Sequence, residues 1–201
     1  MLTHTIFMRL DKNLVLCILL GIFLGIILTS SVVNLADNRV CPQTNCVNEA
    51  NIYPLFNDGF FPAVHDVSHN ADKSIHMVVF ELKYYVDYPD SKENILVSDL
   101  IEAKRRGVDV KIIVDQYSKE NNAFDLLKSE GINIVYDEKD VTTHAKMLIV
   151  DGRIVVLGST NYSYYGLEKN NEVDVLIDSE QTASLYEKYF IDLWVNLTGD
   201  V

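Results

Sequence analysis

The sequence has little proline and glycine, and its acidic residues far outnumber its basic ones. Only 4 of the 201 residues are proline and 9 glycine, while 48% are hydrophobic, which excludes a disordered chain and predicts a sizeable core. Lysine and arginine number 17 against 29 aspartate and glutamate, so the formal net charge is −12 at pH 7. Proteins that hold long nucleic acids usually carry a basic surface, and here only a local basic groove could serve. The densest basic cluster, residues 103–107, is typical of a solvated helix end.

Cysteine is also sparse, which argues against a metal site built on thiolates. Cys17 lies within an apolar run, whereas Cys41 and Cys46 would form a small disulfide loop outside the cell or remain free thiols inside it. The five histidines are scattered. His65 and His69 are four apart and would align on a helix, but the sequence shows no third ligand near them. The sequence therefore predicts no metal ion and no cofactor.

One long apolar run lies near the N-terminus. Residues 14–35 contain no charged side chain, and a helix of these 22 residues is long enough to cross a hydrocarbon core of about 30 Å. We therefore expect residues 1–36 to form a single-pass membrane anchor. A cleaved signal peptide is the alternative, since small residues at 29–31 would allow cleavage. Arg9 and Lys12 precede the run, which favours a cytoplasmic N-terminus and an extracytoplasmic globular part.

Beyond a polar linker at residues 37–50, strand-like and helix-like segments alternate through residues 51–201. Short runs rich in β-branched residues predict strands, and apolar residues at helical spacing predict helices. The predicted strands are 74–82, 108–115, 132–137 and 171–178, with a hairpin within 144–158; the predicted helices are 91–107, 119–131 and 179–196. This alternation predicts an α/β domain, a mixed sheet with helices on its faces.

A set of polar residues lies along the predicted hairpin. His144 and Lys146 are two residues apart, so on a strand they share one face. The pair Asp151-Gly152 favours a tight turn, and Gly-Ser-Thr-Asn at 158–161 follows the second strand. An apolar strand pair gains nothing from a histidine and a lysine on the same face unless an anion lies over them. The hairpin therefore predicts a site for an anionic ligand.

This pattern resembles the signature of the phospholipase D superfamily. The superfamily signature is His-x-Lys, four residues, Asp, six residues, Gly-Ser-x-Asn, and this chain matches every position. The resemblance covers roughly residues 50–196 and implies a phospholipase D-like fold that hydrolyses phosphodiesters without a metal. It implies that His144 attacks phosphorus and forms a phosphohistidine, which water later breaks. By the same resemblance, the catalytic and phosphate-binding residues are His144, Lys146, Asp151, Ser159, Asn161 and Glu172.

The resemblance also suggests a role for each of these residues. Lys146 supplies a cation, and Ser159 and Asn161 supply neutral hydrogen-bond donors to the phosphate. Glu172 is the candidate that holds the second imidazole nitrogen of His144. Asp151 is expected to order the turn and its neighbours. Tyrosines within 162–166 either line a substrate groove or pack at the start of a helix.

The resemblance implies that a complete site needs two signatures, and this chain contains one. The leaving oxygen needs a proton, and an imidazole already acting as nucleophile cannot supply it in the same step. We therefore expect a twofold homodimer in which two His144 side chains face one phosphate. Small one-signature members resemble either endonucleases or a cardiolipin-type phospholipase, so phospholipid and nucleic acid both stay open as substrates. The third alternative is a membrane-bound phosphate-binding module without turnover.

Overall fold

The computed structural model describes residues 16–26, 47, 49–116 and 123–200. The chain divides into two compact units, residues 1–46 and Val47–Val201. In the first unit, residues 16–26 form a helix with exposed apolar side chains. No helix in the described part of the chain is both long and apolar enough to cross a membrane. The rest of the expected anchor, as well as Cys41 and Cys46, lies outside the described residues.

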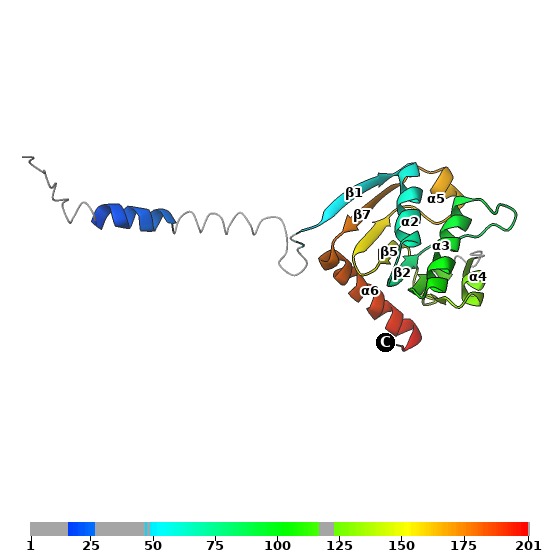
Figure 1. The fold of residues 1–201 in the computed structure, drawn as a ribbon. Coiled ribbons are helices and arrows are strands. Elements are labelled where there is room, and N and C mark those ends of the chain that lie inside the picture. The colour runs from blue at the N-terminus through cyan, green and yellow to red at the C-terminus, as the bar shows by residue number, and fades with distance from the viewer. Residues whose placement is uncertain (1–15, 27–46, 48, 117–122, 201) are drawn as a thin grey trace, which may run out of the picture. The chain divides into compact units, whose positions relative to one another are not determined.

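A seven-stranded mixed sheet forms the centre of the second unit (Figure 1). Its strand order is β1-β7-β6-β5-β2-β3-β4. The strands β2, β3 and β4 are parallel, and every other neighbouring pair is antiparallel. The strands are β1 (Asn51–Phe56), β2 (Ser74–Val79), β3 (Asp109–Val114), β4 (Asn133–Tyr136), β5 (Lys146–Val150), β6 (Ile154–Gly158) and β7 (Val173–Asp178).

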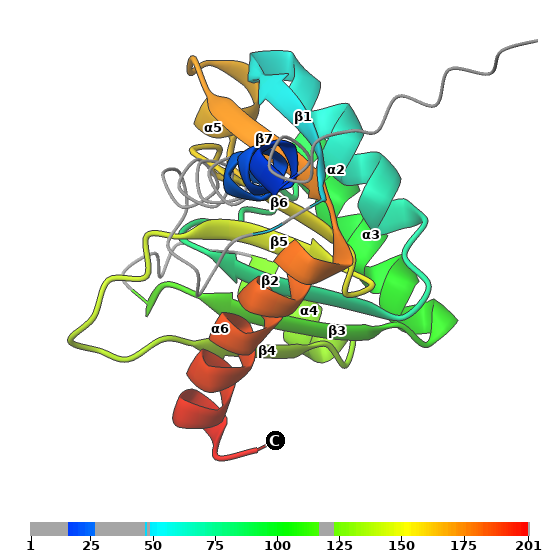
Figure 2. The same ribbon diagram turned by 90° about the vertical axis from the view of Figure 1, so that its left-hand side faces the viewer.

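Helices cover both faces of this sheet, with α2 and α3 on one side and α6 on the other (Figure 2). Alternate residues of β2 face the two layers: Met77 packs in the core shared with α2, α3 and α4, and Val78 packs in the core shared with Phe190 of α6. Burial on both faces explains why this strand is a continuous apolar run. The helices are η1 (Asn57–Gly59, a short 3-10 helix), α2 (Phe60–His69), α3 (Lys92–Arg106), α4 (Ala123–Ser129), α5 (Tyr164–Glu168) and α6 (Glu180–Thr198).

The expected mixed sheet flanked by helices is confirmed. Helix α3 begins after Ser91, whose hydroxyl accepts from the N–H of Asn94, and ends at Gly107 in the left-handed conformation with φ 96°. Helix α4 is shorter than the expected 119–131, of which residues 119–122 lie outside the described part. Strand β1 and helix α2 were not predicted. His144 precedes β5, which starts at Lys146.

Gly158 permits a close approach between β6 and β7. It lies opposite Asp174 in the antiparallel register, and a Cβ at Gly158 would meet the Asp174 carboxylate oxygen Oδ1 at 2.1 Å. That carboxylate accepts hydrogen bonds from the N–H of Thr160 at 3.0 Å and from its hydroxyl at 2.6 Å. The absence of a side chain at Gly158 therefore lets Asp174 hold the loop that follows β6.

We predict that Gly158→Ala lowers the free energy of unfolding by at least about 2 kcal/mol, because the added methyl group collides with the Asp174 backbone and carboxylate. Urea unfolding followed by circular dichroism measures this loss. The matched control is Gly59→Ala, because Gly59 has φ −69° and no atom within 4 Å of an added Cβ. The control should keep the wild-type stability or exceed it by up to about 1 kcal/mol. Equal stability of the two variants would contradict the proposed collision.

Candidate active site

His144 and Lys146 meet at the end of the sheet where β2 and β3 end. Lys146 pairs with Val79, the last residue of β2. Its buried ammonium lies 3.2 Å from each ring nitrogen of His144 and donates a hydrogen bond to the His144 carbonyl at 2.9 Å. The ring of Phe80 supports both groups, with its centroid 4.8 Å from that of His144 and 5.1 Å from the ammonium. The imidazole itself is exposed. An exposed imidazole and a buried cation are thus held side by side.

Carboxylates surround this cation. Burial lowers the pKa of Lys146 below its ordinary value, while the carboxylates of Glu172, Glu81 and Asp115 act in the opposite direction. They therefore limit the cost of keeping the ammonium charged in a partly dehydrated site. Glu81 and Asp115 were not singled out in the sequence as members of this site.

Two buried carboxylates position His144 through its neighbour Thr143. The Thr143 N–H donates to Asp115 Oδ2 at 2.7 Å and to Asp137 Oδ2 at 3.0 Å. The second oxygen of Asp137 accepts from the N–H of Gln116 at 2.8 Å. Asp115 and Asp137 directly follow the neighbouring parallel strands β3 and β4. An aspartate immediately after each of two strands was the signal in the sequence that could have revealed this pair.

The side chain of Ser159 is part of a hydrogen-bonded network. Its hydroxyl donates to the Glu172 carboxylate and accepts from the N–H of Val173 at 3.1 Å. The Glu172 carboxylate also accepts from Asn170 Nδ2 at 2.9 Å, and the Glu172 N–H donates to Asn57 Oδ1 at 2.8 Å. Ser159 therefore orients Glu172 in this structure, whereas the sequence suggested that it donates to phosphate.

The role expected for Glu172 is not completed within one chain. Among the described residues, its carboxylate has no hydrogen bond to His144, although it acts on Lys146 through its charge. Asn161 lies at the end of the same loop, and its amide oxygen is enclosed without a hydrogen-bond partner in the described part of the chain. A rotation of this amide would present its NH₂ group instead. The structure thus gathers His144, Lys146, Ser159 and Glu172 around one region but leaves two polar groups without their expected partners.

Asp151 lies at the opposite end of β5 from Lys146. It occupies the turn before β6 with φ 56°, and its carboxylate accepts from the N–H groups of Asp72, Lys73 and Ser74 at 3.0, 2.7 and 3.0 Å. Burial would raise the pKa of Asp151, but these backbone donors outweigh it and hold the pKa below its ordinary value. Asp151 is expected among the catalytic residues, but its side chain binds the segment that leads into β2, so the structure supports its ordering role alone.

Tyrosines following the signature line a cavity of about 690 Å³. Tyr162 is buried against Phe60, whereas Tyr164 and Tyr165 are exposed and meet edge to face, with ring centroids 5.8 Å apart. One expected role, packing at the start of a helix, therefore occurs at Tyr162, and Tyr164 and Tyr165 line a cavity whose use as a substrate groove stays a prediction. The cavity is lined by Tyr85, Tyr88, Tyr164, Tyr165, Asp87, Asp90, Glu93, Glu168, Pro89 and Ser91.

The Tyr85 hydroxyl is hydrogen-bonded within the lining of this cavity. It accepts a hydrogen bond from the N–H of Tyr164 at 3.4 Å. Burial raises the pKa of this hydroxyl, and the Glu93 and Glu81 carboxylates raise it further. Glu81 also raises the pKa of Lys146, so one carboxylate acts on both the cavity and the buried cation.

Comparison with known proteins identifies the family. The family described as "Cardiolipin synthase, PLD-like domain" matches residues 66–194. The chain belongs to this phospholipase D-like family. The match includes every signature position from His144 to Asn161, as well as Glu172.

Several phospholipase D-like relatives share part of the sequence. The chain is 34% identical over 102 residues to a mitochondrial cardiolipin hydrolase of Chlamydomonas reinhardtii. The matched part covers 49% of this chain and 45% of that protein. It is 28% identical over 118 residues to a phospholipase D of Rickettsia typhi, covering 58% and 53%. The chain thus spans about half the length of the curated relatives it matches.

Among solved structures, the chain is similar to Nuc, a phospholipase D family member from Salmonella typhimurium. The TM-score is 0.64 at 25% identity, and the match covers 73% of this chain and 95% of that one. NucT from Helicobacter pylori shares the fold with a TM-score of 0.62 at 19% identity. The phospholipase D-like fold expected from the signature is therefore confirmed.

We predict that Asp151→Asn lowers stability without removing the signature's chemistry. Asparagine tolerates the left-handed turn but presents no charged acceptor, so the free energy of unfolding should fall by about 1–3 kcal/mol at pH 7. A depressed folded-state pKa stabilises the fold above the unfolded pKa of about 3.9, and that contribution disappears as the pH falls through the folded value. The difference between wild type and variant should therefore shrink below about pH 4. Urea unfolding across this pH range measures it, and a difference that does not depend on pH would contradict the charge argument.

Proposed function

We propose that the protein is a phosphodiesterase that works through a phosphohistidine at His144. The observation that carries this proposal is the Lys146 ammonium, held 3.2 Å from both nitrogens of an exposed imidazole. Family membership supports it, because curated relatives are named as hydrolases and phospholipases of this class. An imidazole beside a fixed cation is suited to attack on a phosphodiester, whose negative charge spreads as phosphorus is attacked.

The reaction divides into two displacements. Neutral His144 attacks phosphorus, a phosphorus–nitrogen bond forms, and the bond to the leaving alkoxide breaks, with a general acid providing the proton for that oxygen. Water then attacks the phosphohistidine, gives up a proton to the same acid–base group, and releases a phosphomonoester. Lys146 stabilises the phosphoryl oxygens in both steps, and neither step requires a metal.

We further propose a twofold homodimer with one shared site. One chain offers a single His144, and among the described residues no second histidine lies beside Lys146 to act as the general acid. A symmetric partner brings a second His144 and also a second Glu172, the acceptor that the imidazole lacks within one chain. The partner chain would thus supply the histidine and the carboxylate that the site of a single chain needs.

For the substrate we propose a phospholipid, and the cavity lined by the tyrosines that follow the signature supports this choice. Its lining combines four tyrosines with four carboxylates, of which Glu168 is paired with Lys92 at 3.1 Å while Asp87, Asp90 and Glu93 have no lysine or arginine in the lining. Aromatic faces and carboxylates attract ammonium groups and disfavour a polyanion such as nucleic acid. The formal net charge of −12 also disfavours a polyanionic substrate. A lipid with an amine-bearing headgroup therefore fits better than a nucleic-acid strand.

The expected membrane anchor agrees with a lipid substrate. We propose that residues 14–35 form a single-pass helix and that the catalytic unit faces the extracytoplasmic side. The helix at residues 16–26 and its exposed apolar side chains support part of this span.

An endonuclease is the second candidate. The similarity to Nuc favours it, because the match covers 95% of that protein at 25% identity. A binding module without turnover is the remaining alternative.

We predict that the full chain hydrolyses phospholipid in the presence of EDTA and that His144→Asn lowers kcat/KM at least about 10³-fold. Vesicles containing phosphatidylethanolamine, phosphatidylcholine or cardiolipin are incubated in parallel with single-stranded DNA and RNA, and products are separated by chromatography. Asp151→Asn is the matched control, since it also alters the signature but lies at the far end of β5.

The pattern of products separates the candidates. Headgroup release confirms the lipid proposal, and products from DNA or RNA alone favour the endonuclease. Binding without product, unchanged in His144→Asn, would overturn the catalytic proposal.

We also predict how activity changes when wild-type and His144→Asn chains are mixed. If each reaction needs both His144 side chains, only wild-type homodimers act, and an equal mixture that has exchanged subunits keeps about a quarter of the activity. Independent sites would instead keep about half. Sedimentation of the same samples measures the dimer directly, so a monomer with full activity would contradict the shared site.

A further inference from the structure

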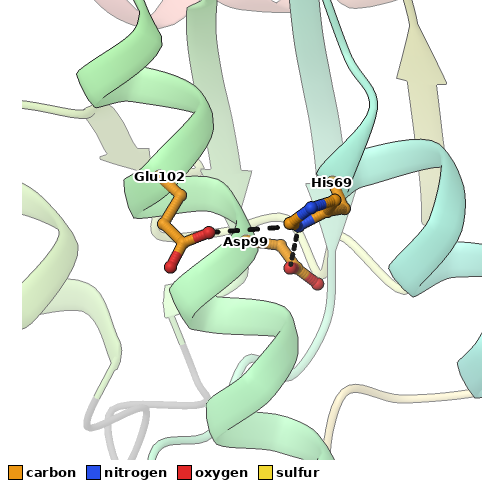
Figure 3. A group of neighbouring side chains, drawn as sticks. All are labelled: His69, Asp99 and Glu102. Carbon is orange, nitrogen blue, oxygen red and sulfur yellow. Dashed lines mark ion pairs between the residues drawn. The ribbon is translucent and has the colours of Figure 1, made fainter.

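Helices α2 and α3 bring together histidines and carboxylates that are far apart in the sequence. His65 and His69 are one turn apart on α2, and Asp99 and Glu102 lie one turn apart on α3. Figure 3 shows His69 facing Asp99 and Glu102 across the gap between the helices. His69 Nδ1 lies 3.5 Å from Asp99 Oδ1 and 3.9 Å from Glu102 Oε2. The missing third ligand for the histidines thus comes from a helix about 30 residues further along the chain.

These distances suit one metal ion. Nitrogen and oxygen ligands at about 2.0–2.2 Å from a tetrahedral zinc ion lie about 3.4 Å from one another. The three ligand atoms of His69, Asp99 and Glu102 all lie within 4.8 Å of each other. The side chain of Glu102 is 54% exposed and that of His69 53%, so both are free to rotate and bring the three ligand atoms closer together.

His65 orients the buried member of this group. Its Nδ1 lies 2.7 Å from Asp99 Oδ2, which leaves Oδ1 facing His69. The Asp99 side chain is only 5% exposed, and the His65 ring is stacked on Phe61 at an interplanar angle of 4°. A hydrogen-bonded carboxylate of this kind is a common feature around metal ligands, because its orientation is fixed before the ion arrives.

Nearby cationic side chains are directed elsewhere. Arg105 Nη2 lies 2.8 Å from Glu130, and Arg106 donates to the carbonyl of Ala71 at 3.0 Å. In the described part of the chain, the ion pairs of Asp99 go to the two imidazoles alone. Arg105 and Arg106 line the same pocket as His69 and Glu102, but in the described part of the chain neither forms an ion pair with Asp99 or Glu102. A divalent ion would neutralise both carboxylates.

We propose that His69, Asp99 and Glu102 bind one divalent transition-metal ion, best matched by zinc, with His65 holding Asp99 in place. One imidazole and two carboxylates leave a fourth position for water. The site lies away from the reacting groups, because His69 is five residues before the start of β2 whereas Lys146 pairs with the residue at its end. That strand is about 17 Å long at about 3.3 Å per residue. The ion therefore links α2 to α3 and takes no part in phosphodiester chemistry.

The test titrates the metal-stripped full chain with Zn²⁺ by calorimetry and follows Co²⁺ binding by visible absorption. One ion per chain should bind, and saturating Zn²⁺ should raise the Tm by about 5 °C. His69→Asn and Glu102→Gln should each abolish the binding and the shift. His65→Asn should keep one ion per chain but weaken its affinity about 10-fold.

The matched control is Asp66→Asn, which removes a charge from α2 next to His65. Asp66 interacts with Asn70 and does not belong to the cluster, so zinc affinity should stay at the wild-type value. Zinc binding that survives in both His69→Asn and Glu102→Gln would overturn the proposal, as would the absence of saturable binding up to about 100-fold excess of metal. Because the ion is remote from His144, hydrolysis of phospholipid well below the Tm should not depend on it, which separates this test from that of the phosphodiesterase.

Discussion

Backbone N–H groups bound by buried carboxylates fix the reacting end of this sheet. The N–H of Thr143 donates to Asp115 and Asp137, and the N–H of Thr160 donates to Asp174. A hydrogen bond to an ionised carboxylate is shorter and stronger than one between neutral groups. Because Thr143 precedes His144 and Thr160 precedes Asn161, these bonds fix the backbone at both ends of the signature. The geometry of the candidate site thus depends on acids whose carboxylates are bonded to the backbone.

This use of acidic residues explains how a chain of net charge −12 can present a site for an anion. Aspartates that accept from backbone N–H groups are committed to the fold, and Lys146 is left as the cation beside His144. The neighbouring carboxylates of Glu172, Glu81 and Asp115 reduce the attraction between this ammonium and polyanions in general. In the proposed reaction, binding energy would act on the phosphoryl oxygens, whose negative charge grows as phosphorus is attacked, which favours catalysis over tight binding of a long strand.

The sequence predicted the parts of the site that are local and left open those that depend on pairing between distant strands. The hairpin, the Ser91 and Gly107 helix ends, and the signature follow from spacing within a few residues. The function of Asp174 could not be predicted from local spacing, because its bonds to Thr160 form only when β7 lies beside β6. Strand β1 was missed because it is an exposed edge strand that contains Pro54 and has no apolar alternation.

Roles assigned by resemblance were less secure than positions. Ser159 occupies its expected place, but its hydroxyl donates to Glu172, so the network within one chain differs from direct phosphate binding. The cluster of His65 and His69 with Asp99 and Glu102 was also beyond the sequence, since helix pairing alone brings its two halves together. In both cases the missing information is which segments face each other.

The spacing of the signature has a geometric reason that follows from the two ends of β5. Lys146 is its first residue and pairs with Val79, while Asp151 follows its last residue and binds the N–H of Ser74, the first residue of β2. The Asp151 N–H also donates to the Ser74 carbonyl at 2.9 Å, so the turn is attached to β2 from both sides. A register slip of one residue would turn Lys146 to the other face of the sheet, away from the ligand. The turn at Asp151 is fixed to β2, and the four residues that follow Lys146 in β5 span the distance from this turn to the lysine. This length therefore places the Lys146 cation beside His144.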